Sequence, residues 1–209
     1  MRVAILGGTG SFGGALAKRL VDAGETVVIG SRDAVRAGEA AAALGASAEG
    51  AANEDAVRRV DLAVLAVKAD GALDTASAVA SALGETPLLS VASLLRPQKG
   101  VGMLPDPDAR SLAERLQDIV GAPVAAGLHS IAAASMDAEP PDEDALVCGD
   151  DPRAKELSLE LARKVVAGRA LDAGPLASAR ALEGLTAVIV NLNRRYKAHA
   201  GIRVTGVDP

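Results

Sequence analysis

The sequence predicts an α/β fold: a doubly wound parallel sheet with a small C-terminal α/β extension. Two observations lead to this prediction. Short apolar runs alternate with segments of helical periodicity along most of the 209 residues, a pattern typical of a parallel sheet covered by helices on both faces. Hydrophobic residues make up 49% of the chain, which is enough for a sizeable core, and that core must be aliphatic because only Phe12 and Tyr196 are aromatic.

The first unit of the chain has the pattern of a dinucleotide site. An apolar run over residues 2–6 is followed by a turn that contains GxGxxG at Gly8, Gly10 and Gly13, then by a helical segment over 15–23 and a second apolar strand over 25–30. Glycines at this spacing allow a tight turn and close approach of the backbone to a pyrophosphate. The N-terminus of the following helix offers free N–H groups to phosphates. These features predict a Rossmann-like fold.

The end of the second strand indicates which dinucleotide is bound. A chain that selects NAD usually has an acidic residue there, which holds the ribose 2′-hydroxyl. This chain has Ser31 and Arg32, with Arg36 one turn further on. A hydroxyl and a guanidinium can bind a 2′-phosphate, so we predict NADP. We expect Asp33, which would oppose that phosphate, to cap the next helix instead.

The alternation continues to the end of the chain. We expect a loop over residues 93–107, because five Pro and Gly residues exclude a regular element there. Residues 137–144 form an acidic, proline-bearing segment that we expect to be a solvated surface loop. Asn53 is the expected cap of one helix, and Asp150 or Asp151 that of another. The expected helices cover 33–44, 53–59, 71–83, 111–120, 152–166 and 175–199, and the further strands cover 61–67, 86–91, 123–128, 145–149 and 169–174.

Composition excludes several classes of partner. The net charge of −5 and the lack of a basic stripe argue against nucleic acid, and no apolar run is long enough to span a membrane. The first strand begins too early to leave room for a signal peptide. Cys148 is the single cysteine, so no internal disulfide can form, which favours a cytoplasmic protein. With one Cys and two His, we expect no metal site.

Few residues could carry out acid–base or nucleophilic chemistry. Cys148 lies in a buried-looking strand and is expected to be an inert core thiol, and His199 is expected at the surface. His129 follows the strand over 123–128, at the sheet edge where a nicotinamide should lie. It is either a structural histidine or a group that positions the second substrate. Ketone reduction needs a proton donor, whereas hydride transfer between two redox cofactors needs mainly positioning.

Three further motifs accompany the glycine turn and Ser31-Arg32. They are Gly127-Leu128-His129-Ser130-Ile131-Ala132-Ala133, Val147-Cys148-Gly149-Asp150-Asp151 and Leu171-Asp172-Ala173-Gly174-Pro175-Leu176. Together they resemble the NADPH-dependent F-420 reductases, also called F-420:NADP oxidoreductases, over nearly the whole chain. The resemblance implies hydride transfer, in either direction, between NADP(H) and the deazaflavin coenzyme F-420, and it implies a homodimer.

The resemblance also implies site residues. Thr9, Gly10, Ser11 and Phe12 match the pyrophosphate turn, and Ser31 and Arg32 match the 2′-phosphate site. Ala133 matches a residue beside the nicotinamide, and His129 and Ile131 match residues near the deazaflavin. We include Val67, at the end of a strand facing the cleft, among the cofactor-binding residues. The family's two domains are expected here as an NADP-binding domain over 1–126 and a smaller domain over 127–209 that completes the cleft.

The chain departs from the family pattern in two loops. Lys68-Ala69 stands where archaeal members often have Pro-Trp, and residues 91–97 replace a loop of Pro-Leu-Val-Pro type. Both loops face the cleft, so two alternatives stay open: an NADPH-dependent reductase of a flavin, an imine or another small electrophile, and a non-catalytic NADP-binding sensor. The apolar stretch Ala187-Val188-Ile189-Val190 is either a dimer contact or part of the chain's own core.

Overall fold

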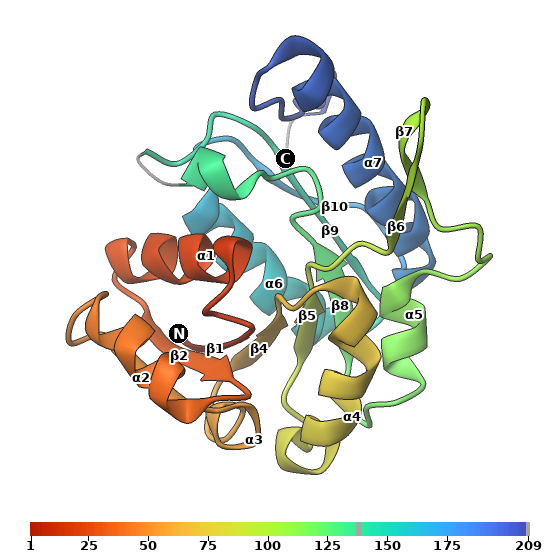
Figure 1. Cartoon of the computed structure of the whole chain (residues 1–209). Coiled ribbons are helices and arrows are strands. Elements are labelled where there is room, and N and C mark those ends of the chain that lie inside the picture. Colours follow the sequence, from red (N-terminus) through yellow and green to blue (C-terminus); the bar gives the residue numbers. More distant parts are fainter. Residues whose placement is uncertain (137–138, 208–209) are drawn as a thin grey trace.

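One eight-stranded sheet runs through the whole molecule (Figure 1). The computed structural model describes residues 1–136 and 139–207. The strand order β10-β9-β8-β5-β4-β1-β2-β3 contains β3-β2-β1-β4-β5-β8, which is the 3-2-1-4-5-6 order of a dinucleotide-binding sheet with β8 as the sixth strand. The predicted Rossmann-like fold is therefore confirmed. The strands of this sheet are β1 Arg2–Leu6, β2 Thr26–Ser31, β3 Ala48–Ala52, β4 Leu62–Leu65, β5 Leu88–Ser90, β8 Val124–Gly127, β9 Ala145–Gly149 and β10 Ala170–Asp172.

Helices cover both faces of the sheet because the strands are apolar on both sides. In β1, Val3 and Ile5 pack into one core cluster with residues of α1, α2 and α6. Ala4 and Leu6 pack into the other cluster, with residues of α3, α4, α5 and α7. The helices are α1 Ser11–Asp22, α2 Ala34–Ala42, α3 Asn53–Ala56, α4 Ala72–Leu83, α5 Leu112–Gln117, α6 Pro152–Val165 and α7 Ala179–Tyr196, with 3-10 turns η1 Ala69–Gly71, η2 Ala133–Met136 and η3 Leu176–Ser178.

The last two strands reverse the direction of the sheet. β9 runs antiparallel to β8 and parallel to β10, whereas the other neighbouring pairs are parallel. The C-terminal extension is therefore joined edge to edge with the first six strands and shares their core. The expected boundary between 126 and 127 falls inside β8.

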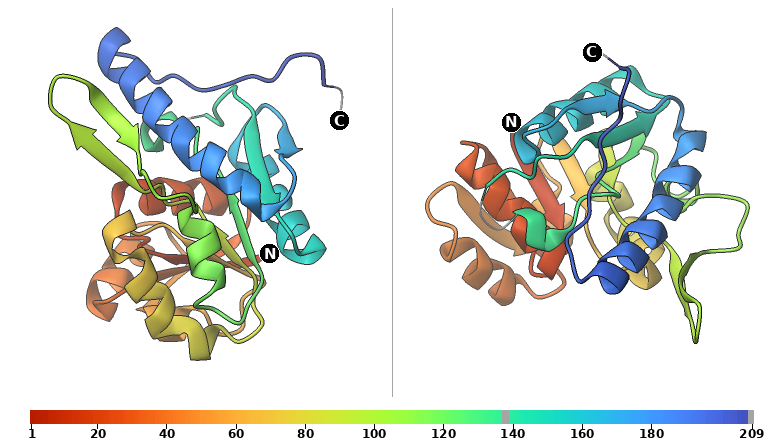
Figure 2. Two further views of the ribbon diagram at one scale, coloured as in Figure 1. Left: turned by 90° about the vertical axis from the view of Figure 1, so that its right-hand side faces the viewer. Right: turned by 90° about the horizontal axis from the view of Figure 1, so that it is seen from above.

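The expected loop over 93–107 is wrong, because this segment forms a β-hairpin. β6 Leu95–Gln98 pairs antiparallel with β7 Gly102–Pro105. A two-stranded ribbon leaves one edge of each strand unpaired, and proline is tolerated at such an edge. The hairpin extends away from the sheet beside α7 (Figures 1 and 2). There the Asn191 side chain accepts from Met103 N at 2.8 Å and donates to Met103 O at 2.8 Å.

β3 was not predicted from the sequence, and the cap predicted for the helix that follows it is wrong. β3 is an edge strand of five residues with no buried side chain, so it lacks the apolar run that marks the other strands. Ala52 is the N-cap residue of α3 and makes no side-chain cap bond, whereas the expected cap Asn53 lies inside the helix. Two other caps form as expected: Asp33 accepts from two amides of α2, and Asp151 accepts from Ala154 N.

The acidic segment 137–144 is not a solvated loop where it meets β9. Asp144 is fully buried and accepts from Arg169 N, Nε and Nη2 and from Val204 N. Glu143 is buried too, and its burial raises the pKa of its carboxyl to about 7. The C-terminal residues 200–207 pass over this pair, since Asp144 N donates to Ile202 O at 2.8 Å. Residues 137 and 138 lie outside the described residues.

None of the helices in the described ranges is both long enough and apolar enough to cross a membrane.

Candidate active site

The carboxyl ends of β1, β2, β4, β5 and β8 meet at one edge of the sheet, and the predicted site residues follow these ends. The pairings of these strands are all parallel. The glycine turn, Ser31, Val67, Ser93 and His129 therefore lie along the same edge. Ligands of open α/β sheets bind at this edge, near the point where the strand order reverses, which here lies between β1 and β4.

The glycine turn is as tight as the motif predicts. Gly7 has φ +84, and a Cβ there would lie 2.8 Å from Ala66 O. A Cβ on Gly13 would lie 2.4 Å from Gly7 O, a distance that side chains do not adopt. The turn is held by bonds from Gly10 N to Gly7 O at 2.9 Å and from Gly14 N to Gly10 O at 2.8 Å. The backbone of the turn is thus packed so closely that two of its residues must be glycine.

The N-terminus of α1 is open to a ligand. Its N-cap is Gly10, and no side chain caps the helix. The first turn therefore keeps free N–H groups and the positive end of the helix dipole. This arrangement fits a pyrophosphate, which binds where backbone N–H groups converge at a helix N-terminus.

The residues expected to select NADP lie at the end of β2 and in the first turn of α2. Ser31 Oγ accepts from Asp33 N at 3.2 Å, so the hydroxyl proton of Ser31 is available to a ligand. The Asp33 carboxylate accepts from Val35 N and Arg36 N, which ties this negative charge to the helix. Arg32 and Arg36 are exposed. The structure therefore leaves two cations and a hydroxyl at the strand end, with the nearby acid already engaged.

A pocket of about 240 Å³ opens beside the glycine turn, and it brings together four of the predicted residues: Phe12, Val67, His129 and Ile131. Most of the remaining lining is apolar, with Lys68 at its rim: Ala66, Lys68, Ala69, Val91, Ala92, Ser93, Leu95, Leu128 and Thr186. Ala133 does not line this pocket and lies two residues beyond Ile131, at the start of η2.

His129 is held inside this pocket by two hydroxyl groups. Its Nδ1 lies 3.1 Å from Ser93 Oγ, which lies 2.7 Å from Thr186 Oγ1. Thr186 Oγ1 donates to the His129 carbonyl at 2.8 Å. The other ring nitrogen, Nε2, is buried and has no partner among the described residues. Burial lowers the pKa of His129 to about 4, so the ring is neutral at pH 7.

The backbone next to His129 is strained. Leu128 has φ +62, a left-handed conformation that costs a non-glycine residue of order 1 kcal/mol, and its side chain is fully buried. Such strain is found preferentially at functional sites. Here it turns the chain sharply between β8 and His129.

Ser93 and Thr186 were not predicted as site residues. Ser93 follows β5 at the carboxyl edge of the sheet, so its position could have identified it. Thr186 lies in the middle of α7 and meets the site only through tertiary packing, so the sequence contains no signal for it. Two other predictions are confirmed, since Cys148 is fully buried, with its pKa raised to about 12 by burial, and His199 is exposed.

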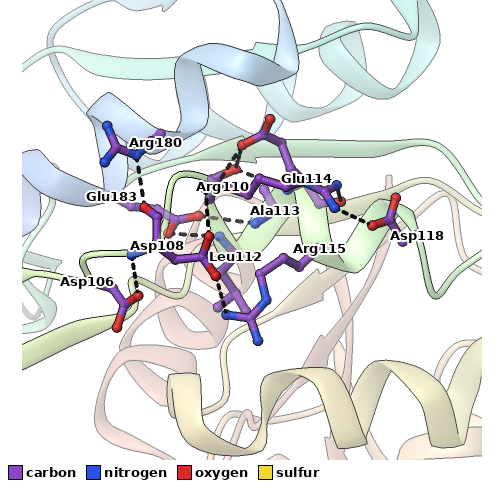
Figure 3. A network of polar contacts seen from close by, with 11 residues as sticks. Asp106, Asp108, Arg110, Leu112, Ala113, Glu114, Arg115, Asp118, Arg180 and Glu183 are labelled. Atoms are coloured by element: carbon purple, nitrogen blue, oxygen red, sulfur yellow. Dashed lines mark hydrogen bonds and ion pairs between the residues drawn. The ribbon is translucent and has the colours of Figure 1, made fainter.

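A polar network between α7 and the segment that leads into α5 holds α7 in place (Figure 3). Glu183, one turn before Thr186, is buried and accepts from Leu112 N at 3.0 Å and Ala113 N at 3.1 Å. Its carboxylate thus binds the free N–H groups at the start of α5. Arg180 Nε donates to Asp108 O at 3.1 Å. These contacts fix the part of α7 that carries Thr186.

The fold and this edge define a dinucleotide-binding oxidoreductase of the Rossmann class. Residues 2–93 match the family described as NADP oxidoreductase, coenzyme F-420-dependent. An F-420-dependent NADP reductase of Methanothermobacter thermautotrophicus is 35% identical over 99% of this chain and 96% of its own length. With these matches, the chain belongs to the family of coenzyme F-420-dependent NADP oxidoreductases.

Two further comparisons extend over the full length. An F-420-dependent NADP reductase of Methanocaldococcus jannaschii is 32% identical over 100% of both chains. The crystal structure of a candidate F-420-dependent NADP reductase from Arthrobacter sp. FB24 superimposes with a TM-score of 0.86, at 25% identity, over 98% of this chain and 99% of that chain. The resemblance on which the sequence prediction rested is therefore confirmed at the level of family and fold.

Proposed function

We propose that this protein transfers hydride between NADP(H) and coenzyme F-420, with the two reacting rings held together in the pocket beside His129. The observation that carries the proposal is the chemistry of this pocket: it is mostly apolar, it adjoins the glycine turn, and its one histidine is buried and neutral. When bound, the two cofactors supply the carbon that gives the hydride and the carbon that receives it. The protein then has to position the rings and exclude water.

In this proposal the NADP half of the site is built around the turn and the end of β2. The backbone of Gly8, Gly10 and Gly13, with Thr9, Ser11 and Phe12, holds the pyrophosphate at the uncapped start of α1. The 2′-phosphate is bound by the Ser31 hydroxyl and by the guanidinium groups of Arg32 and Arg36. The nicotinamide enters the pocket beside Val67, and Ala133, at the start of η2 just outside the pocket lining, contacts it from there.

The second half of the site takes the deazaflavin. His129 and Ile131 follow β8, whereas Val67 follows β4 and Phe12 follows β1, so the pocket lining comes from strands on both sides of β5. Apolar side chains pack on the ring, and His129 positions it without acting as acid or base. In this proposal the chain has two domains: residues 1–126 form the NADP-binding domain, and residues 127–209 form a smaller domain that completes the cleft.

The proposal is tested by mixing purified protein with NADPH and oxidised F-420 and following the loss of deazaflavin absorbance. We expect turnover with F-420 and little with FMN or a cyclic imine. Turnover with FMN or the imine alone would identify the protein as a different NADPH-dependent reductase. NADPH binding with no turnover of any acceptor would favour a sensor.

We also propose that the protein is a cytoplasmic homodimer that associates through α7. The stretch 187–190 divides between two environments: Ala187 and Ile189 are buried in the chain's own core, whereas Val188 is 52% exposed. Val188, Leu192 and Tyr196 recur at four-residue spacing along the helix, and all three are exposed. Sedimentation of the wild type and of Val188→Glu tests this interface: we expect a dimer and a monomer. A monomeric wild type would contradict the proposal.

A further inference from the structure

Three residues that line the pocket form an ordered chain of hydrogen bonds, which begins and ends on the same residue. It runs from the ring of His129 through the hydroxyls of Ser93 and Thr186 and returns to the His129 carbonyl, over distances of 3.1, 2.7 and 2.8 Å. The three residues follow β5, follow β8 and lie in α7, so the chain joins segments far apart in the sequence.

The number of protons available in this hydrogen-bond chain determines which group donates in each bond. A hydroxyl has one proton, and a carbonyl oxygen can only accept. The Thr186 proton must therefore go to the His129 carbonyl. The contact between Thr186 and Ser93 then needs the Ser93 proton, which leaves Ser93 Oγ only as an acceptor toward the ring. A neutral imidazole has one N–H, and the bond to Ser93 requires it at Nδ1.

We infer that Ser93 and Thr186 are positioning residues that hold His129 in the Nδ1–H tautomer, so that Nε2 presents a hydrogen-bond acceptor to the second substrate. This inference deepens the proposed function and rests on it for the identity of that substrate. The buried and unpartnered Nε2 is the observation that calls for a ligand, because a buried acceptor without a partner costs free energy. The matching donor is an N–H or O–H group on a flat ring, such as a ring imide or a phenol.

The carboxylate of Glu183, one turn before Thr186 in α7, is engaged elsewhere, because it accepts from the amides at the start of α5. The pocket holds one cation at its rim, Lys68, among the lining residues of the described chain. No carboxylate lines the pocket, so nothing there favours a charged imidazole ring.

Nitrogen-15 NMR of histidine-labelled protein tests the tautomer directly. The chain has only two histidines, and a His129→Asn variant assigns their signals. At pH 7 we expect His129 to carry its proton at Nδ1, with Nε2 as the unprotonated nitrogen. A proton at Nε2 in the wild type would overturn the inference, whatever the enzyme does with F-420.

Two variants should move that proton for different reasons. In Ser93→Ala the Nδ1–H loses its acceptor. In Thr186→Val the Ser93 proton is released and can be donated to Nδ1, which forces the ring proton to Nε2. Ser93→Thr keeps the hydroxyl and should keep the wild-type tautomer. The unchanged His199 signal and unchanged NADPH binding serve as checks that each variant folds. Retention of the Nδ1–H form in both Ser93→Ala and Thr186→Val would contradict the inference.

A kinetic measurement tests the consequence for the substrate. We expect Ser93→Ala and Thr186→Val to raise KM for F-420 by about tenfold, the effect of one misdirected hydrogen bond in a buried site, while Kd for NADPH stays the same. Ser93→Thr should restore KM. Equal KM values in all four proteins would show that Nε2 does not bind the substrate. Wild-type protein that neither binds nor turns over F-420, yet has the Nδ1–H form, would contradict the proposed function and leave the tautomer established.

Discussion

The glycine turn and the hydrogen bonds around His129 lie on the same edge of one sheet. They are built from different parts of the polypeptide. The turn consists of backbone: a Cβ on Gly13 would lie 2.4 Å from a carbonyl oxygen, and α1 is left uncapped. The chain beside His129 consists of side chains from three separate segments. The first site therefore depends on the absence of side chains, and the second depends on the identity of particular ones.

The largest effect is expected from adding one methyl group to the turn. Gly13→Ala places a Cβ against the Gly7 carbonyl oxygen, so the turn or the start of α1 must shift. We expect Kd for NADPH, measured by calorimetry, to rise about 100-fold, or roughly 3 kcal/mol. Gly14→Ala is the matched control, because its Cβ would lie 3.4 Å from the nearest atom. Equal affinities in the two variants would remove the contrast between the two sites.

The histidine site should respond to pH, whereas the turn contains no titratable side chain. Burial lowers the pKa of His129 to about 4, from about 6.5 in an unfolded chain. Between these values the unfolded state binds more protons, so stability falls as the pH decreases from 6.5 to 4. We expect the free energy of unfolding, relative to a His129→Asn variant, to fall by about 2 kcal/mol between pH 7 and pH 5.

The titration of Glu143 changes stability in the opposite direction to that of His129. The two contributions to the pH dependence must therefore be separated. Its pKa is raised to about 7, so the folded state binds more protons between pH 4.5 and 7 and stability falls as the pH rises through that range. The pH profile of the wild type therefore contains two opposing contributions, and only differences between variants resolve them. A Glu143→Gln protein should gain stability over the wild type as the pH rises, by about 2 kcal/mol between pH 5 and pH 8.

A smaller effect is expected at the strand end that selects NADP. Arg32→Ala removes a guanidinium that the structure leaves exposed and that we assign to the 2′-phosphate. We expect the ratio of NADPH to NADH affinity to fall about tenfold, the size of one charge-assisted hydrogen bond. Arg59→Ala is a suitable control, because Arg59 is exposed and outside the proposed site. An equal loss of NADPH affinity and NADH affinity would show that Arg32 does not bind the 2′-phosphate.

The smallest effect is expected at the base of the hairpin. Asn191→Ala removes two hydrogen bonds to Met103, and we expect a loss of about 1 kcal/mol in stability. Hydrogen exchange at the Met103 amide should accelerate, with Kd for NADPH unchanged. Asn193→Ala is the control, because Asn193 accepts from Ala200 N in the C-terminal residues and makes no hairpin bond. Equal acceleration in both variants would mean that Asn191 does not hold the hairpin.

The same contrast explains how much of the molecule the sequence could predict. The turn was predictable because glycine spacing reports backbone geometry directly, and the apolar strands were predictable because burial on both faces leaves a continuous run. Asp33 and Asp151 were predictable as caps because capping is local. Each of these features is set by residues within one or two turns of each other.

What could not be predicted depends on contacts between distant segments. Prolines in residues 93–107 argue for a loop by local rules, yet pairing with β7 and packing on α7 stabilise a hairpin. Asp144 looks like part of an acidic surface segment until Arg169, 25 residues later, is placed beside it. Thr186 is one threonine in a long helix, and only the packing of α7 brings it to Ser93.

The buried thiol of Cys148 has a practical consequence for studying the hairpin. It is the single cysteine of the chain, it is fully buried and its pKa is about 12, so thiol-specific dyes have no reactive target on the folded surface. Replacing Lys99, at the exposed tip of the hairpin, by cysteine would create one labelling position. A fluorophore attached there would report the movement of the hairpin in single molecules without any background labelling to remove.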